Sequence, residues 1–147
     1  MKKLYVALGL AGLSFLAHAQ MTPLGAWNTI DDKTNKPKAV IRITANANGA
    51  LSGVVEKSLE VNPNTEPNCD KCTDDRKGKP KIGMEIIRGG KKVDGKDVWE
   101  EGKILDPENG TDYRLRLTPI EGGKKLEVRG YIGTPLLGRT QTWVRVE

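Results

Sequence analysis

The chain has 147 residues, with 24 Lys and Arg against 19 Asp and Glu, so its formal net charge is +5. Charges of both signs are interleaved, and no basic run with stacking aromatics indicates a nucleic-acid-binding surface. The only histidine is His18. If it is removed with a signal peptide, the rest of the chain has no imidazole for Ser-His-Asp or Cys-His catalysis, or for the commonest zinc sites.

The N-terminal residues are typical of a signal peptide. Lys2 and Lys3 precede an apolar run over residues 4–16, and Ala17-His18-Ala19 has small residues at the two positions that signal peptidase reads. The apolar run is shorter than the roughly 20 residues that span a bilayer. We therefore expect cleavage after Ala19 and export to the periplasm or beyond. Residues 20–147 are then a single domain without a transmembrane segment.

Beyond position 20 the sequence predicts short β-strands. Gly, Pro, Asn and Asp recur at short intervals between β-rich stretches, and no long run has a helical period. Tyr113, Leu115 and Leu117 alternate with charged residues, which predicts an antiparallel sheet with one apolar face. Eight strands are expected, at residues 24–31, 38–45, 50–57, 82–88, 97–105, 111–118, 124–132 and 139–146.

Eight strands joined by hairpins predict an all-β domain, a single up-and-down antiparallel β-barrel in which closure removes the two edge strands. A sandwich of two four-stranded sheets is the alternative. Residues 58–81 interrupt the rhythm with prolines, two cysteines and charges that do not alternate, so we expect one long loop there.

Gly25-Ala26-Trp27 is similar to the glycine-x-tryptophan that opens the first strand of lipocalins and fatty-acid-binding proteins. In such barrels the tryptophan plugs the closed end, and an arginine from the last strand stacks on it through a cation-π contact. Arg145 is the expected partner of Trp27, and Arg139 is the second candidate. The alternative is that Trp27 is simply a core aromatic. Trp143 is also expected to be structural.

The C-terminal third carries a more specific pattern, Arg129-Gly130-Tyr131-Ile132-Gly133 followed by residues 137–143, LGRTQTW. Here the chain resembles bacterial domain of unknown function family 2147, which comprises exported proteins with a lipocalin-like barrel. The resemblance extends to residues 25–37, to both cysteines and to residues 102–110. It implies a lipocalin-like fold and export, but the family has no agreed activity.

Cys69-Asp70-Lys71-Cys72 has the spacing of a redox motif, but no βαβ pattern surrounds it and no third or fourth metal ligand is near. We predict a structural disulfide between Cys69 and Cys72 in an oxidising compartment. Redox activity or metal binding is the alternative. No cofactor is expected.

Two polar segments could contribute to a site. Glu100, Glu101 and Asp106 form the densest carboxylate group near a strand. Adjacent strand residues point to opposite faces, so Glu100 and Glu101 share a site only if a bulge intervenes, and solvated charges are the preferred interpretation. The segment 31–37 is interpreted as a polar turn, with contact to a ligand at the barrel rim as the alternative.

The leading functional hypothesis is a non-catalytic carrier or sensor that binds a small apolar or amphipathic molecule inside the barrel. We expect a pocket of roughly 300 Å³ or more, open at the end opposite Trp27, with the loop 58–81 near its mouth. Tyr113 could orient a polar head group. Alternation predicts the inward-facing lining residues to be Ile41, Ile43, Met84, Ile86, Tyr113, Leu115, Leu117, Leu126 and Val128.

Two alternatives come from other functional classes. One is an envelope interaction module whose barrel is filled by its own side chains and which binds a protein or an envelope polymer through its surface, with Trp99 and Tyr131 as exposed aromatics. The other is an enzyme that uses carboxylates, Lys or Tyr. The volume of the inward side chains distinguishes a hollow barrel from a filled one.

The signal-peptide interpretation predicts that exported protein begins at Gln20, because the charged, apolar and small-residue regions occur in the required order. Intact-mass measurement of protein from the envelope or the medium checks this. Exported material that still begins at Met1 would contradict it.

Overall fold

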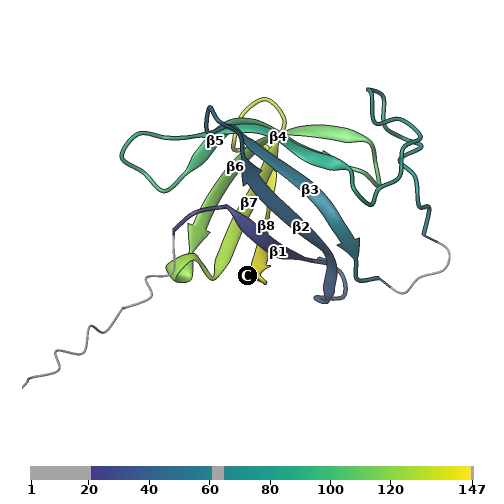
Figure 1. The fold of residues 1–147 in the computed structure, drawn as a ribbon, viewed down its shortest axis with the longest axis horizontal. Coiled ribbons are helices and arrows are strands. Elements are labelled where there is room, and N and C mark those ends of the chain that lie inside the picture. The colour runs from purple at the N-terminus through teal and green to yellow at the C-terminus, as the bar shows by residue number, and fades with distance from the viewer. Residues whose placement is uncertain (1–20, 61–64, 147) are drawn as a thin grey trace, which may run out of the picture.

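The computed structural model describes residues 21–60 and 65–146, which form a closed antiparallel barrel of eight strands (Figure 1). The expected signal peptide lies outside these residues. Each strand pairs with the next, and β8 pairs back to β1, so the all-β barrel is confirmed and the sandwich is excluded. In chain order the strands are β1 Gly25–Ile30, β2 Pro37–Ala45, β3 Leu51–Ser58, β4 Glu85–Lys92, β5 Trp99–Asp106, β6 Thr111–Ile120, β7 Lys125–Tyr131 and β8 Gly138–Arg145.

The antiparallel order places the connections at two ends of the barrel. One end, which we call the tryptophan end, carries residues 21–24, the β2–β3 and β4–β5 turns, and the 3₁₀ turn Glu121–Gly123 between β6 and β7. The other end carries the β1–β2, β3–β4, β5–β6 and β7–β8 connections. We call it the disulfide end, because Cys69 and Cys72 lie in the β3–β4 connection.

The strand boundaries agree closely with expectation except at β4, which was expected at residues 82–88 and spans Glu85–Lys92. Gly89 and Gly90 follow the expected end of the strand, but they lie inside it. Gly89 pairs with Gly102 of β5, where an added Cβ would lie 2.8 Å from the Gly89 carbonyl carbon. These glycines therefore allow two backbones to approach closely, which is a common role of glycine within strands.

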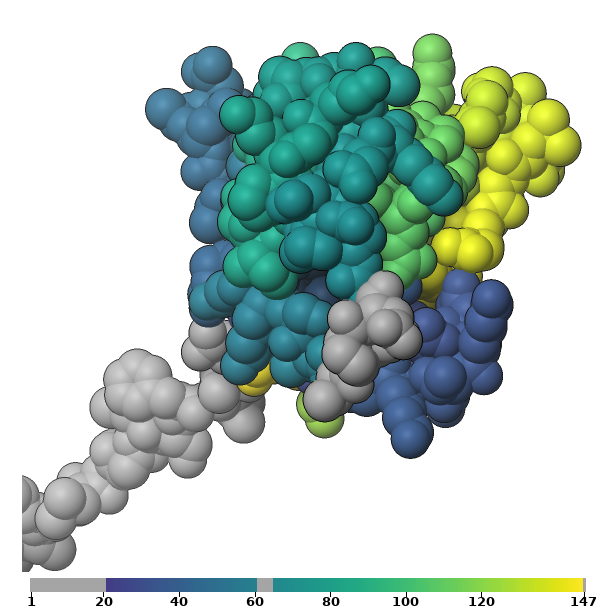
Figure 2. Space-filling model, turned by 90° about the vertical axis from the view of Figure 1, so that its right-hand side faces the viewer, coloured from purple at the N-terminus to yellow at the C-terminus, as the bar shows by residue number. Residues whose placement is uncertain are grey.

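The described part of the β3–β4 connection, residues 65–83, contains the predicted disulfide between Cys69 and Cys72. Both cysteines are buried, and Cys69 Sγ lies 3.4 Å from the carbonyl oxygen of Pro107 in the β5–β6 turn. At Gly110 an added Cβ would lie 1.9 Å from the carbonyl oxygen of Lys71, so only glycine fits there. Figure 2 shows this segment in teal at the centre of the face that it views.

A buried arginine anchors the same segment to the barrel. Arg76 is only 5% exposed, and its Nη2 lies 2.6 Å from Asp74 Oδ2 and 3.1 Å from Asp112 Oδ1. Its Nη1 donates to the carbonyl oxygen of Glu85 at 2.9 Å. The hydrogen bonds from Arg76 lower the pKa of Asp74 to about 2, so this carboxylate is charged at neutral pH. The buried charge is thus paired and hydrogen-bonded, as buried charges require.

Because Arg76 holds the segment independently of the disulfide, Cys69→Ser should loosen residues 65–83 while the barrel stays folded. A ring of four residues removes only about 2 kcal/mol of unfolded-state entropy, which limits the loss of global stability. Amide hydrogen exchange checks this: faster exchange should be confined to residues 65–83. Loss of protection in β6 and β7 would contradict the prediction.

Candidate functional site

The tryptophan end of the barrel is closed by a stacked pair. Trp27 is fully buried, and the Arg145 Cζ atom lies 4.1 Å from the centroid of its ring. The two residues are also backbone partners in the β1–β8 pairing. The indole Nε1 donates to the carbonyl oxygen of Pro23 at 2.8 Å. A guanidinium this close to an indole is well within the range of a cation-π interaction.

The same arginine ties three chain segments together. Its Nε donates to the Gly123 carbonyl at 2.6 Å, and its Nη1 and Nη2 donate to the Leu24 and Thr22 carbonyls at 2.7 Å each. Arg139, the second candidate partner of Trp27, is not in this cluster. Its Nη1 lies 3.4 Å from Asp32 Oδ2, because it precedes Arg145 by six residues on β8 and therefore lies toward the other end.

The inward positions of the strands form one apolar core. Of the nine residues predicted to line the interior, eight are buried, and Tyr113 is half-buried near the disulfide end. Sequence reasoning missed Ile87, which pairs with Gly53 and with the inward Ile104. A register shift at Gly53/Val54 changes the phase of β4, so strict alternation from Met84 does not reach Ile87. The core also contains Leu51, Val55, Trp99 and Trp143.

Large side chains fill the space even where a strand carries glycine. An added Cβ on Gly53 would lie 2.8 Å from the Ile87 side chain, and one on Gly130 would lie 3.3 Å from the Cβ of Tyr113. Trp143 is buried opposite Leu126, and its Nε1 donates to Gln141 Oε1 at 3.2 Å. Neighbouring side chains therefore occupy the space beside these glycines.

Two cavities of the described residues lie outside the barrel. The larger, about 310 Å³, is a groove on the outer side of β2 and β3, bounded by Ile82 and Gly83 and by the Arg42–Glu56 ion pair. The smaller, about 190 Å³, lies between the disulfide segment and the β5–β6 turn. The expected interior pocket is therefore not among them, because the inward residues pack against one another.

Polar contacts cross the disulfide end of the barrel, where the mouth of a pocket was expected. Lys38 on β2 forms an ion pair with Glu108 in the β5–β6 turn. Burial opposes the charge on Lys38, but the hydrogen bond and charge of Glu108 raise the pKa of Lys38 overall. The Tyr113 hydroxyl accepts a hydrogen bond from Asn109 Nδ2 at 3.1 Å. The ion pair joins β2 to the β5–β6 turn, whereas the Asn109–Tyr113 bond lies within the β5–β6 hairpin.

The segment 31–37 is a turn stabilised by its own first residue. Asp31 Oδ1 accepts hydrogen bonds from the backbone N–H groups of Lys33 and Thr34, each at 2.8 Å, and these bonds lower the pKa of Asp31. Asp32 Oδ2 accepts from Gln141 Nε2 at 3.2 Å, which attaches the turn to β8. This is the polar-turn interpretation made from the sequence.

The prediction that Trp99 and Tyr131 are exposed aromatics is wrong. Trp99 and Tyr131 are each only 9% exposed. Trp99 pairs with Leu117, an inward residue, and so belongs to the core. Tyr131 is packed against Gly138 of β8, where an added Cβ would lie 2.7 Å from the Tyr131 Cβ. Neither ring is available as a surface anchor.

The carboxylate group at residues 100–106 does not converge on a site. Glu100 Oε1 accepts from Arg116 Nε at 2.9 Å, and Asp106 Oδ1 accepts from the backbone N–H of Glu108. A bulge is present, with Glu101 at φ 65°, but Glu101 is exposed. Across residues 21–60 and 65–146, no group of three or more His, Cys, Asp and Glu could hold a metal ion. Over the same ranges no helix has the length and apolar character needed to cross a membrane.

Comparison with known proteins agrees with the fold. The family model for uncharacterized proteins conserved in bacteria (DUF2147) matches residues 25–145, and the chain belongs to that family. A solved structure similar to this one is protein HP1028 from Helicobacter pylori, described as belonging to the lipocalin family. It is 17% identical with a TM-score of 0.70, and the match covers 84% of this chain and 82% of that one. The barrel is therefore lipocalin-like. No curated protein matches the chain.

Because Trp27 is buried within the closed end, Trp27→Ala should destabilise the protein by about 3–5 kcal/mol through the cavity it leaves. Chemical denaturation followed by circular dichroism measures this. Leu136→Ala, at a site 89% exposed, is the control and should change stability by less than about 0.5 kcal/mol. A loss below about 1 kcal/mol for Trp27→Ala would contradict the burial.

Proposed function

We propose that this protein is an exported, non-catalytic binding module of the bacterial envelope, whose barrel is filled by its own side chains and which binds its partner through its outer surface. The observation that carries the proposal is the location of empty space. Cavities of about 310 and 190 Å³ lie outside the barrel, while the inward residues are buried against one another. Fold class alone would not separate this function from a carrier, because one fold can serve many functions.

The packing of the interior argues against a bound ligand. A site for a small molecule typically needs at least about 300 Å³. In this barrel, Ile41, Ile43, Leu115, Leu117 and Leu126 are each at most 1% exposed. The space beside the inward glycines is filled by neighbouring side chains, as it is at Gly53, where Ile87 packs. A ligand of that size would have to displace core side chains.

The proposed absence of catalysis rests on the state of the polar groups. Residues 20–147 contain no histidine. Asp74 and Asp112 share Arg76, Glu100 is bonded to Arg116, and the Tyr113 hydroxyl is bonded to Asn109. Each of these groups therefore has a structural partner. The proposed export rests on the signal-peptide pattern of residues 1–19.

A second candidate function is carriage of a small amphipathic molecule, and the outer groove favours it. At about 310 Å³ it reaches the lower limit for ligand sites, and it combines the aliphatic side chains of Val54 and Ile82 with the charges of Arg42 and Glu56. Such a groove could hold an acyl chain beside a polar head group.

Overpacking distinguishes a filled barrel from a hollow one. In a filled interior Leu115→Trp should cost about 1–3 kcal/mol, because the larger ring forces neighbouring side chains from their rotamers. Leu137→Trp, at a site 72% exposed, makes the same exchange outside the core and should be nearly neutral. Urea denaturation measures both variants.

Titration with an environment-sensitive fatty-acid probe completes the test. If the barrel is filled, the probe has no interior site, so Leu115→Trp should not remove any saturable binding. A near-neutral Leu115→Trp variant that also abolishes saturable probe binding would overturn the filled barrel. Saturable binding that survives Leu115→Trp but is lost in Ile82→Asp would identify the outer groove as a carrier site.

A further inference from the structure

We propose that the outer face of β4–β7, together with the β7–β8 loop, docks on the surface of an anionic lipid bilayer. This inference rests on the proposed function, since it names the partner of the outer surface. Two adjacent features carry it, a set of basic side chains and an exposed aliphatic loop. We call the first the basic face, which comprises Arg88, Lys91, Lys103, Arg114, Arg116 and Arg129.

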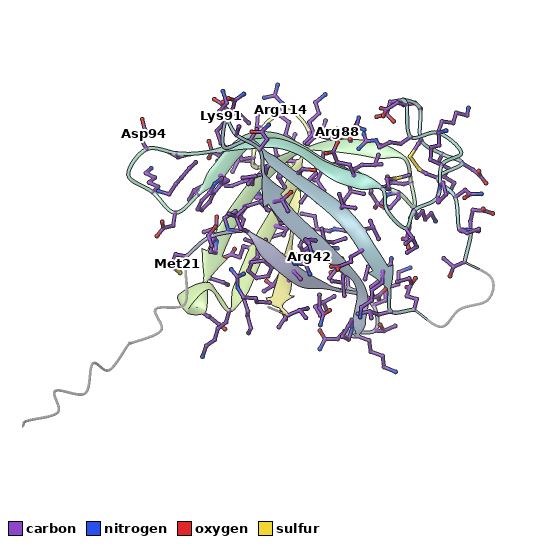
Figure 3. The ribbon with its side chains drawn as sticks, viewed as in Figure 1. Met21, Arg42, Arg88, Lys91, Asp94 and Arg114 are labelled. Carbon is purple, nitrogen blue, oxygen red and sulfur yellow. A yellow bond between two sulfur atoms is a disulfide. The ribbon has the colours of Figure 1, made fainter. Side chains whose placement is uncertain are left out.

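The centre of the basic face is a row of like charges. Arg88 pairs with Lys103 across β4 and β5, and Lys103 pairs with Arg114 across β5 and β6. Like charges directly opposite one another destabilise a sheet. Arg88 is compensated by Asp75 at 2.9 Å and Glu85 at 2.7 Å. Figure 3 shows Lys91, Arg114 and Arg88 along the same upper side of the barrel.

Lys103 and Arg114 are different, because both are exposed and no carboxylate of the described residues forms an ion pair with either. Of the acidic residues nearby, Asp112 is engaged by Arg76 and Glu100 by Arg116, and the exposed Glu101 forms no ion pair with either Lys103 or Arg114. Folding therefore gains nothing from placing Lys103 opposite Arg114. An anionic partner would relieve their repulsion.

The aliphatic feature is the loop between β7 and β8. Ile132, Leu136 and Leu137 are 59%, 89% and 72% exposed. Hydrogen bonds bridge this loop. Arg129 Nε donates to the Pro135 carbonyl at 2.8 Å, and the Leu137 N–H donates to the Thr134 carbonyl at 3.0 Å. Its aliphatic side chains are thus exposed on a loop whose backbone carbonyls at Thr134 and Pro135 are hydrogen-bonded.

The two features adjoin. Tyr131, the last residue of β7, pairs with Arg114, so the loop leaves the sheet beside the unpaired charges. Neighbouring strands are about 4.8 Å apart, which places Lys103 about 10 Å from the base of the loop. Arg129 reaches the loop directly and carries positive charge to it.

A bilayer interface matches both features at once. Anionic headgroups attract Lys and Arg near the membrane surface, and the boundary with the acyl chains accepts exposed Leu and Ile side chains. A soluble anionic polymer would satisfy the charges but would offer nothing apolar to Leu136 and Leu137. The combination therefore favours lipid.

Co-sedimentation of the mature protein with vesicles tests the proposal. The protein should bind vesicles of phosphatidylcholine and phosphatidylglycerol, bind phosphatidylcholine alone at least ten-fold more weakly, and dissociate as salt screens the charges. Lys103→Glu with Arg114→Glu should weaken binding at least ten-fold, since each basic residue near such a surface contributes about 1 kcal/mol. Leu136→Asp with Leu137→Asp should weaken it comparably.

The matched control is Lys33→Glu with Lys57→Glu, which makes the same change in net charge at exposed positions on β3 and the β1–β2 turn. It should retain most of the binding. Leu136→Trp supplies a direct readout, because the three native tryptophans are buried and the added one is exposed. Its emission should shift to the blue on anionic vesicles.

Absence of wild-type binding to anionic vesicles, or equal loss in the control variant, would overturn the docking surface. Binding to heparin that needs Lys103 and Arg114 but tolerates Leu136→Asp, with no vesicle binding, would assign the face to a polymer instead. These failures leave the proposed surface function intact as long as Leu115→Trp is destabilising. If instead Leu115→Trp is neutral and abolishes probe binding, the proposed function fails whatever the vesicles show.

Discussion

The pairing of β1 with β8 is the contact on which the rest of the barrel depends, because it turns an open sheet with two edges into a closed one. It is short, joining Trp27 to Arg145 and Asn28 to Val144. The same two residues, Trp27 and Arg145, stack through their side chains. One pair therefore closes the sheet and plugs its end, and the guanidinium also donates to the backbone carbonyls of Gly123, Leu24 and Thr22.

Closure alone leaves open whether the barrel is hollow. In this protein the answer comes from side-chain volume at a few positions. Three tryptophans, from β1, β5 and β8, share the core with aliphatic residues of β2 to β7, and Ile87 occupies the space beside Gly53. Eight strands give an interior just wide enough for side chains to fill or for one small ligand. The packing here supports the first case, which is why we propose that recognition uses the outside of the sheet.

The outer surface uses its charges in two ways. Around the disulfide segment they are paired: Arg76 bonds two aspartates, and Arg88 bonds Asp75 and Glu85. These pairs attach a segment without regular secondary structure to β4 and β6. On the adjoining parts of β5 and β6, Lys103 and Arg114 face each other without an ion pair to a carboxylate of the described residues. The contrast within one sheet separates charges that support the fold from charges that are available to a partner.

Much of the architecture could be predicted from the sequence, because it depends on local patterns. Alternation at Tyr113, Leu115 and Leu117, with turn residues at short intervals, indicates the strands and their inward faces. The glycine-x-tryptophan at Gly25–Trp27 and the arginine at position 145 indicate which end is closed. The spacing of Cys69 and Cys72 indicates their disulfide.

The tertiary structure decided what depends on register and volume. The bulge that brings Ile87 into the core and the burial of Trp99 and Tyr131 depend on cross-strand partners distant in sequence. So does the meeting of Lys103 with Arg114. A shift of one residue in register reverses the face of every side chain, and whether a barrel is filled depends on the summed volume of residues from all its strands. Local sequence therefore determined which elements form, and only their assembly decided how the interior is packed and which charges meet on the outer surface.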